Sequence, residues 1–241
     1  MKRMVIIVIM MMLVSVNAYA DPTPEQILQK VADNYTKIND MTADMVNTIT
    51  IHINGKPEKV NGPYIRKSYQ KSPDKSKIED SINNSSYIIN GNDVYFEDPK
   101  SGLQSIRLDQ DGIFDSSQIN IFYETAKAIE KNIFKILNHE VKNGKNIYKV
   151  EMASKNENKV YKKMVFEINY EDGLLLKDDF YNAADFLLVT NEQVEYTTID
   201  GIIVAVQVKE TKYFIDGYTE NIISYNNIKL NTGLSDSLFS P

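Results

Sequence analysis

The sequence of 241 residues contains no cysteine. This absence excludes disulfide bonds and thiol nucleophiles. It also excludes the cysteine-attached lipid anchor of bacterial lipoproteins. The folded chain must therefore be held together by its hydrophobic core, and a mature chain of about 220 residues is long enough to form one.

Residues for other kinds of catalysis are also scarce. His52 and His139 are the only histidines, and neither has a ligand-like neighbour at useful spacing, so both are expected at ordinary surface positions. The segment Gly233–Ser237 lacks the final glycine of a G-x-S-x-G motif. Asp178 and Asp179 are adjacent in a predicted strand, so their side chains should point to opposite faces and cannot act as a paired acid and base. The sequence predicts no catalytic residue, no cofactor and no metal site, and it favours a protein that is not an enzyme.

The first twenty residues have the pattern of a secretory signal peptide. A basic start is followed by the apolar run Met4–Val16 and by the A-x-A site Ala18–Ala20, which predicts cleavage between Ala20 and Asp21. The apolar run is too short for a comfortable membrane span. We therefore expect a protein exported to the periplasm, whose mature chain forms a single domain over residues 21–241.

The mature chain is acidic. The full sequence has 27 Lys and Arg against 33 Asp and Glu, and residues 1–20 hold two of the basic residues, so 25 against 33 leaves a formal charge of −8. Binding to a phosphate backbone needs clustered cations, so this charge argues against a nucleic-acid partner. The locally basic run Lys67–Lys77 is interrupted by Ser, Pro and Asp, which is typical of a solvated loop.

A helix is expected at the start of the mature chain. Thr23 and Gln26 can form a capping box, and Pro24 suits the first helical position. An apolar stripe at helical spacing follows and is ended by Asn39-Asp40; it consists of Ile27, Leu28, Val31, Tyr35 and Ile38.

Most of the remaining chain is predicted to be a series of β-hairpins. Three β-rich runs in Glu192–Asn231 are separated by Asp200-Gly201 and Asp216-Gly217, and such pairs favour tight turns because they accept positive φ. Eight of the ten glycines follow Asn or Asp, which favours hairpins over βαβ crossovers. Further strands are expected at 45–53, 64–70, near Ile78 and Ile82, and at 87–89, 94–96, 147–152, 160–170 and 174–181.

One helical insert is predicted within this series. After Ser116-Ser117, apolar residues recur at helical spacing from Phe122 to Leu137. A sheet on the order of ten strands must curl or close, and two helices are too few to bury a flat sheet of that size. The fold class expected is therefore mainly β with two helices, a strongly curved antiparallel sheet or unclosed β-barrel whose concave apolar face the helices cover.

A hydrophobic ligand cavity is expected between the helices and the concave face of this sheet. The apolar faces of the central strands and of the inserted helix are its candidate walls, although plain core packing explains the same pattern. The candidates are Ile49, Ile51, Phe96, Phe122, Ala126, Ile129, Met164, Phe166, Ile168, Val194, Tyr196, Val204 and Val206.

The order of these segments resembles the LolA-like family of periplasmic lipoprotein carriers, in particular its outer-membrane lipoprotein-sorting branch. The resemblance extends over nearly the whole mature chain. It rests on the order of PEQILQKVADNYTKINDMTADMVNTITI, KSPDKSKIED, YIINGNDVYFEDP, VFEINYEDGLLLKDDFYNAADFLL, YTTIDGIIVAVQVKE and NNIKLNTGLSDSLFSP.

The resemblance implies an unclosed antiparallel β-barrel with helices over a concave apolar face. It also implies a carrier that binds acyl chains of lipid-modified proteins or lipids and moves them toward the outer membrane. The partners implied are an inner-membrane transporter as donor and an outer-membrane acceptor, with only transient contact to membrane proteins and a monomeric carrier. Relatives with this fold also serve as envelope sensors, so the alternative is an interaction module that regulates a membrane partner.

One position departs from the family pattern. The best-known carriers have an Arg directly before the Pro of the strand-ending motif, and that Arg helps to latch the helical lid. Here the position is Ser72, and Arg66 is close in sequence without being the matching residue. The resemblance therefore does not extend to a lid mechanism that depends on this Arg, and the way a lid would close is left open.

Overall fold

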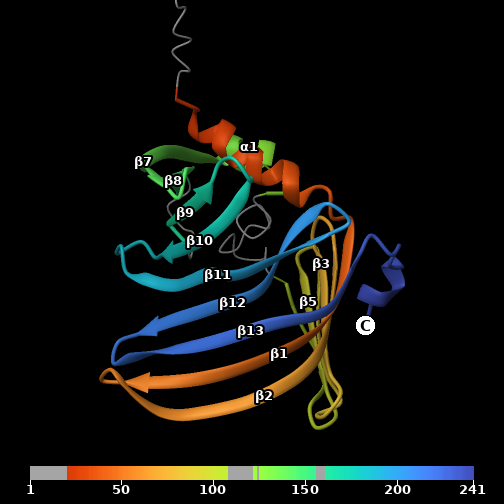
Figure 1. Ribbon diagram of the computed structural model, residues 1–241. Helices are drawn as coiled ribbons and strands as arrows, with labels where there is room; N and C mark the ends of the chain where they lie inside the picture. Colours follow the sequence, from red (N-terminus) through yellow and green to blue (C-terminus); the bar gives the residue numbers. More distant parts are fainter. Residues whose placement is uncertain (1–20, 108–121, 124, 156–160) are drawn as a thin grey trace, which may run out of the picture.

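The computed structural model describes residues 21–107, 122–123, 125–155 and 161–241, whose strands form one curved sheet (Figure 1). Among these residues the sheet has thirteen strands in the order β6-β5-β4-β3-β2-β1-β13-β12-β11-β10-β9-β8-β7. Neighbouring strands pair antiparallel, and β6 and β7 remain as the two separate edges, so the barrel is not closed. The predicted fold class is confirmed. The strands are β1 (Asp40–Ile53), β2 (Lys56–Lys71), β3 (Lys75–Asp80), β4 (Ser85–Asn90), β5 (Asp93–Asp98), β6 (Gly102–Arg107), β7 (Asn132–Lys142), β8 (Lys145–Ser154), β9 (Lys163–Asn169), β10 (Leu174–Tyr181), β11 (Leu187–Ile199), β12 (Ile202–Phe214) and β13 (Gly217–Leu230).

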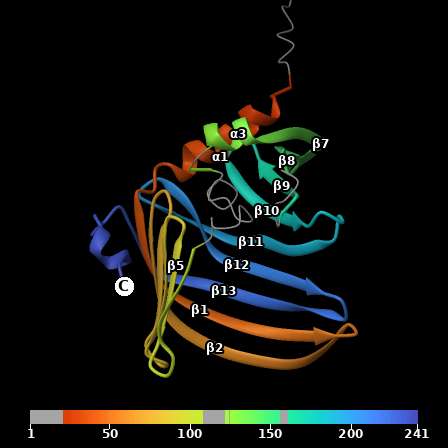
Figure 2. The same ribbon diagram turned by 180° about the vertical axis from the view of Figure 1, so that it is seen from behind.

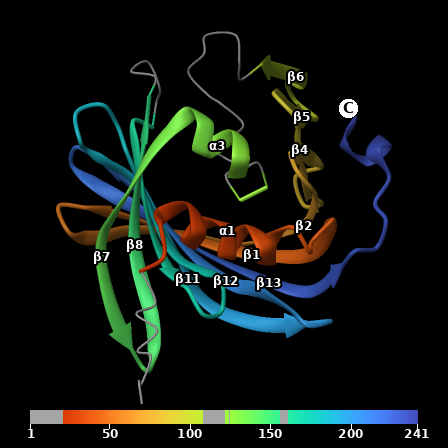
Figure 3. The same ribbon diagram turned by 90° about the horizontal axis from the view of Figure 1, so that it is seen from above.

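Two helices lie on the concave side of the sheet. Seen from above, α1 (Pro24–Tyr35) and α3 (Thr125–Lys131) are placed between β7 and β8 on one side and β4 to β6 on the other (Figure 3). The view from behind shows both helices at the end of the molecule formed by β7 to β10, while β1, β2 and β13 extend away from them (Figure 2). The helices therefore cover only part of the concave face.

Helix α1 forms as its capping residues predict. Thr23 Oγ1 accepts from the backbone N–H of Gln26, and the Gln26 side chain accepts from the N–H of Thr23, which completes the capping box. The helix ends at Tyr35, about one turn before the predicted stop. Its apolar stripe packs into the main core with residues from β8, β9 and β10; this core comprises Ile27, Leu28, Val31, Phe122, Ala128, Tyr148, Val150, Met152, Met164, Phe166, Ile168 and Leu175.

The Asn-Gly and Asp-Gly turns largely behave as predicted. Asp200 and Gly201 have φ of 50° and 78°, which joins β11 to β12 with Ile199 opposite Ile202. Gly217 differs, because the β12–β13 turn consists of residues 215–216 and Gly217 is the first residue of β13. A glycine is needed there for another reason: an added Cβ would lie 2.0 Å from the carbonyl oxygen of His52 on the neighbouring strand.

The predicted helix from Phe122 to Leu137 is wrong in its second half. Helix α3 ends at Lys131, where the Asn132 side chain donates to the Ala128 carbonyl at 2.8 Å, and Ile133 and Leu137 belong to strand β7. Residues four apart share a face in a helix and in a strand alike, so their spacing does not distinguish the two. The β-branched residues and the Asn143-Gly144 turn into β8 favour the hairpin that forms.

Two smaller predictions also change. Ile82 is not in the third strand, because β3 ends at Asp80 and Ile82 lies 72% exposed in the following turn. The strand predicted at 160–170 is shorter, because β9 begins at Lys163 and ends at Asn169. Val160, the signal segment 1–20 and Ser116-Ser117 lie outside the described residues.

The end of the chain is fixed on the outside of the sheet. The buried carboxylate of Asp40 accepts four hydrogen bonds from residues 232–234, at 2.7 to 3.1 Å. Burial alone would raise the pKa of Asp40, but these hydrogen bonds outweigh it and lower the pKa below its usual value. Lys71 and Lys75 then hold Asp236 in the 3₁₀ helix η1 (Asp236–Phe239), at 2.9 and 2.7 Å.

Candidate functional site: adjoining cavities under helix α1

Two adjoining cavities lie between helix α1 and the concave face of the sheet. The first has a volume of about 180 Å³ and the second of about 500 Å³. Tyr35, Leu175, Gln193 and Val208 line both, so the two cavities share a wall. The second volume is within the range of roughly 300 to 1,000 Å³ that is typical of small-molecule sites.

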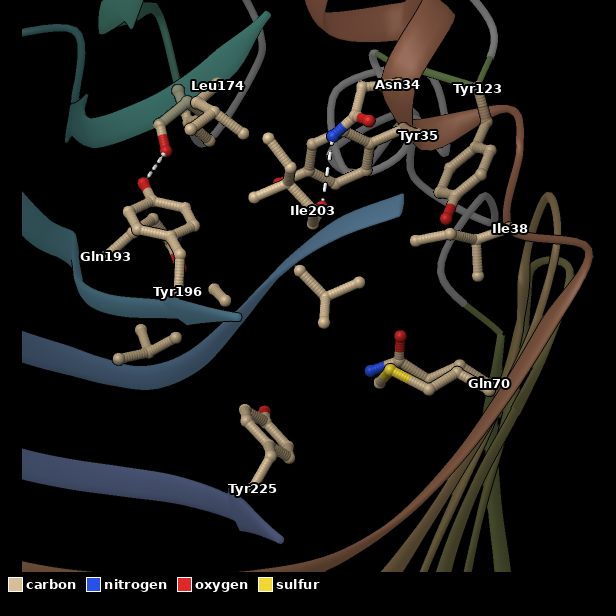
Figure 4. Close-up of a pocket in the computed structure, with 15 residues that line it drawn as sticks. Asn34, Tyr35, Ile38, Gln70, Tyr123, Leu174, Gln193, Tyr196, Ile203 and Tyr225 are labelled. Carbon is tan, nitrogen blue, oxygen red and sulfur yellow. Dashed lines mark hydrogen bonds between the residues drawn. The ribbon is translucent and has the colours of Figure 1, made fainter. Parts of the chain in front are cut away.

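The first cavity is lined by the end of α1, the segment after it, Tyr123, and strands β1, β2 and β10 to β13. Figure 4 shows the rings of Tyr35, Tyr123, Tyr196 and Tyr225 around it. Its other lining residues are Asn34, Ile38, Met41, Gln70, Leu174, Leu175, Gln193, Ile203, Val204, Ala205 and Val208.

Two hydrogen bonds hold the walls of the first cavity together (Figure 4). The side chain of Asn34 at the end of α1 donates to the carbonyl of Ile203 in β12 at 3.1 Å, which ties the helix to the sheet. The Tyr196 hydroxyl donates to the carbonyl of Leu175. Burial raises the pKa of both Tyr35 and Tyr196 above the usual value, and for Tyr35 the nearby Asp178 adds to the shift. These hydroxyls are therefore neutral hydrogen-bonding groups in an otherwise apolar space.

The second cavity changes from apolar to polar across the sheet. Phe166, Asp178, Asn191 and Glu210 are direct cross-strand neighbours on β9 to β12, and all four line it. A parallel row contains Met164, Phe180, Val189 and Lys212. Tyr35, Phe122, Tyr161, Leu175, Gln193 and Val208 complete the walls.

Asp178 is the charged group most strongly affected by this environment. Its side chain is buried, with the residue only 7% exposed, and it accepts a hydrogen bond from Asn191 Nδ2 at 3.0 Å. Burial raises the pKa of Asp178 to about 7; the Asn191 hydrogen bond opposes this shift, and the neighbouring Asp179 adds to it. The carboxyl group is therefore partly protonated near neutral pH. The Asp179 carboxylate instead accepts from Thr190 at 2.6 Å, which confirms that the two side chains point to opposite faces.

Beyond the cavities the same face of the sheet carries a polar network. Asn47 donates to Asn221 at 3.1 Å, and Arg66 donates to Asn47 at 3.2 Å and to the buried Asp80 at 3.4 Å. Asn221 is four residues from Tyr225 on β13 without a register shift, so it faces the same side as the first cavity. A polar network therefore interrupts the apolar residues of the concave face beyond the cavities.

The predicted cavity residues fall into three groups. Tyr196 and Val204 line the first cavity; Phe122, Met164 and Phe166 line the second, and Ile168 lies in the core beside them. Ile49 and Ile51 face the same side but lie next to the polar network around Asn47 and Asn221. The remaining predicted residues line neither cavity: Phe96 is 40% and Val194 50% exposed, Ala126 is exposed, and Ile129 and Val206 are half-buried. Their part in ligand binding stays a prediction.

The polar residues of the cavities are not predicted by the sequence pattern. Asn34, Asp178 and Asn191 carry no motif. Asn34 is placed by the packing of α1 on β12, and Asp178 and Asn191 are placed by the pairing of β10 with β11. Strict alternation predicts Val194 on the same face as Tyr196, but register shifts on either side of Glu195 break that alternation in β11.

The two histidines take part in ordinary ring contacts. His52 stacks on Tyr218 and His139 on Tyr148, each with ring centres 4.4 Å apart. Within the described part of the chain, no three His, Cys, Asp or Glu side chains are grouped so that they could hold a metal ion. None of the helices in that part combines the length and the hydropathy of a membrane-spanning segment.

Three solved structures share this fold. A DUF1329 family protein from Desulfovibrio piger has 19% identity and a TM-score of 0.66, with 91% of this chain and 98% of that chain covered. A putative outer membrane lipoprotein-sorting protein domain from Vibrio parahaemolyticus has 18% identity and a TM-score of 0.65, with 90% of this chain and 97% of that chain covered. A LolA superfamily protein from Nitrosomonas europaea has 19% identity and a TM-score of 0.65, with 91% of this chain and 98% of that chain covered. At these identities the likeness establishes the fold.

Sequence comparisons are more limited. No curated protein matches the chain. A family model described as "Uncharacterized protein" matches residues 121–241, which is just over half of the chain. The chain therefore belongs to the family that this model defines, and its fold is the LolA-like fold that the sequence resemblance implied.

Proposed function

We propose that this protein is a non-enzymatic carrier that binds acyl chains of lipid-modified proteins or lipids in the two cavities under α1. The observation that supports this most directly is the pair of adjoining cavities, with mainly aromatic and aliphatic walls, between a helix and an open sheet. Protein interiors are normally packed without such spaces, so their presence favours a binding role over plain core packing.

The physical need for such a carrier follows from the hydrophobic effect. Burial of one methylene stabilises by about 0.8 kcal/mol, so a 16-carbon chain exposed to water costs on the order of 12 kcal/mol. A protein that shields the chain in an aqueous compartment must also release it. At the cavity, the Asn34 side chain of α1 donates a hydrogen bond to β12, and a neutral bond of this kind contributes only about 1 kcal/mol, so this contact can be broken during release.

We further propose that the carrier works in the periplasm and moves its cargo toward the outer membrane. The signal-peptide pattern of residues 1–20 supports export, and the fold shared with a lipoprotein-sorting domain supports this direction of transport. An inner-membrane donor and an outer-membrane acceptor would then be its transient partners.

A fluorescent fatty-acyl probe tests the binding site. Ala205 lines the first cavity, and a Phe at this position should fill it. If the new ring displaces about three methylenes, affinity should fall by about 2.4 kcal/mol, or roughly fiftyfold. Val194→Phe is the matched control, because Val194 is 50% exposed and lines neither cavity.

The control should bind the probe within about twofold of the wild type, by the same conversion of energy to affinity. Equal weakening by both variants, with both folded, would place the acyl site elsewhere. Absence of saturable probe binding to the wild type would remove the carrier proposal and leave the sensor or interaction module as the better interpretation.

A further inference from the structure

The polar wall of the second cavity is a built feature of the sheet. Phe166, Asp178, Asn191 and Glu210 stand in register on four consecutive strands, so the surface changes from aromatic to polar within one row. An acyl chain needs only the apolar part of this row. The polar part therefore calls for a separate explanation.

Asp178 has hydrogen-bonding capacity to spare. An ionised carboxylate offers about four lone-pair sites. Among the residues that the structure describes, Asn191 is the one hydrogen-bond donor to it. Its cross-strand neighbour on the other side is Phe166, which is 1% exposed and cannot donate. A buried acceptor that lines a cavity with unused capacity is stabilised when a ligand supplies the missing donor.

The surrounding charges determine which kind of donor fits. Glu210 is paired with Lys212 at 3.0 Å, and Asp179, on the opposite face of β10, is paired with Lys177 at 3.2 Å. Each of these two cations thus already has a carboxylate partner. Tyr35 from α1 and Tyr161 add hydroxyl groups to the cavity but no charge.

The balance of these charges is negative. Within the described parts of the chain, Asp178 is the acid of this wall that forms no ion pair with a cation. An anionic ligand group would therefore be repelled from this wall, and a neutral or cationic donor would be attracted.

We propose that Asp178 and Asn191 form a polar subsite for the head of an amphiphile, which donates N–H or O–H hydrogen bonds to Asp178 while its chain packs against Phe166, Met164 and Phe180. The ligand class is an acyl or alkyl chain with an amide, hydroxyl or ammonium group at its polar end, in contrast to a free fatty acid or a phosphate ester. This inference rests on the proposed function, because it specifies the ligand of the same site.

Matched ligands of one chain length test the subsite. Dodecylamine, dodecanol and dodecanoate each compete with the fluorescent acyl probe at pH 8, below their micelle concentrations. We expect the wild type to bind dodecylamine at least tenfold more tightly than dodecanoate. This comparison needs no variant, so it stands whether or not a variant folds.

The variant Asp178→Asn keeps the shape of the side chain and removes its charge. It should weaken dodecylamine binding by about tenfold to a hundredfold, the range expected for a hydrogen bond to a charged group, and bring it close to that of dodecanol. Asp179→Asn is the control, because Asp179 lies on the same strand and lines neither cavity. It should leave the order of the three ligands unchanged.

The possible failures are distinguishable. If the probe binds but dodecylamine and dodecanoate compete equally in both wild type and Asp178→Asn, the subsite is refuted and the acyl cavity remains. Tighter binding of dodecanoate than of dodecylamine also overturns the subsite. If no probe or ligand binds to the wild type, the proposed function fails and the subsite fails with it.

Discussion

Replacing Asp178 by Asn tests the electrostatics of the second cavity without any ligand. In the unfolded chain the carboxyl group has a pKa near 3.8, whereas burial raises its pKa to about 7 in the folded protein. Between these values the folded state holds a proton that the unfolded state has released. Stability should therefore fall as pH rises through this window, which is the reverse of the usual behaviour of a salt-bridged Asp.

The size of the effect follows from the shift of about three pKa units. At about 1.36 kcal/mol per unit, ionisation of Asp178 destabilises the folded state by roughly 4 kcal/mol in total, of which roughly 3 kcal/mol accumulates between pH 5 and pH 8. Asn cannot ionise, but its side-chain oxygen can still accept from Asn191. Relative to the wild type, Asp178→Asn should thus gain roughly 3 kcal/mol of stability over this pH range.

Urea denaturation of the wild type and of Asp178→Asn at pH 5, 6, 7 and 8 measures this difference. The contributions of the other titrating groups are the same in both proteins and cancel when one unfolding free energy is subtracted from the other. Asp40→Asn is the control, and its stability difference from the wild type should stay constant from pH 5 to pH 8, because Asp40 titrates below this range. The hydrogen bonds to Asp40 lower its pKa, so the stability it contributes is present at neutral pH and is lost as pH falls through the folded pKa. A stability difference between Asp178→Asn and wild type that stays within about 1 kcal/mol from pH 5 to pH 8 would contradict the raised pKa, and would mean that Asp178 is well hydrated.

Three further predictions concern the core, the helix contact and export. Phe166→Ala should lower the unfolding free energy measured in a urea titration by about 3 to 5 kcal/mol. The reason is that Phe166 is 1% exposed and packs edge-on against Phe122, with ring centres 5.7 Å apart. A loss below about 1 kcal/mol would show that its surroundings are loosely packed. Gly173→Ala should lower the unfolding free energy by about 1 to 3 kcal/mol more than Gly144→Ala does. Both glycines have positive φ, but an added Cβ at Gly173 would lie 2.5 Å from the backbone oxygen of Lys30 in α1, whereas at Gly144 it would meet nothing within 4 Å. Equal losses of stability would contradict the close contact between the β9–β10 turn and the helix. N-terminal sequencing of the exported protein should begin at Asp21 with DPTPEQ, and retention of Met1 on a membrane-embedded product would overturn the signal-peptide prediction.

Local features of the fold could be predicted because their causes lie within a few residues. The capping box of α1 and the φ > 0 turns at Asn54-Gly55 and Asp200-Gly201 are decided by adjacent side chains and backbone sterics. The helix predicted through Ile133 and Leu137 is wrong because apolar residues four apart fit a helix and a strand equally. Pairing with β8 decides between them, and that pairing is a tertiary interaction.

The candidate site could be predicted only in part for the same reason. Alternation places Met164 and Phe166 on one strand face correctly, and both line the second cavity. It could not show that Asp178 and Asn191 stand in the same cross-strand row as Phe166, because register across β9, β10 and β11 is not a property of any one strand alone. Nor could it show that Ile49 lies opposite the polar Asn221 of β13.

Native mass spectrometry of the mature protein, purified from the periplasm of its own cells, tests the carrier proposal most directly. We predict a complex with an acyl-bearing lipid or lipoprotein in the wild type, and its loss in Ala205→Phe, whose new ring fills the first cavity. Wild-type protein that carries no acyl ligand but a stoichiometric protein partner, unaffected by Ala205→Phe, would contradict the carrier proposal.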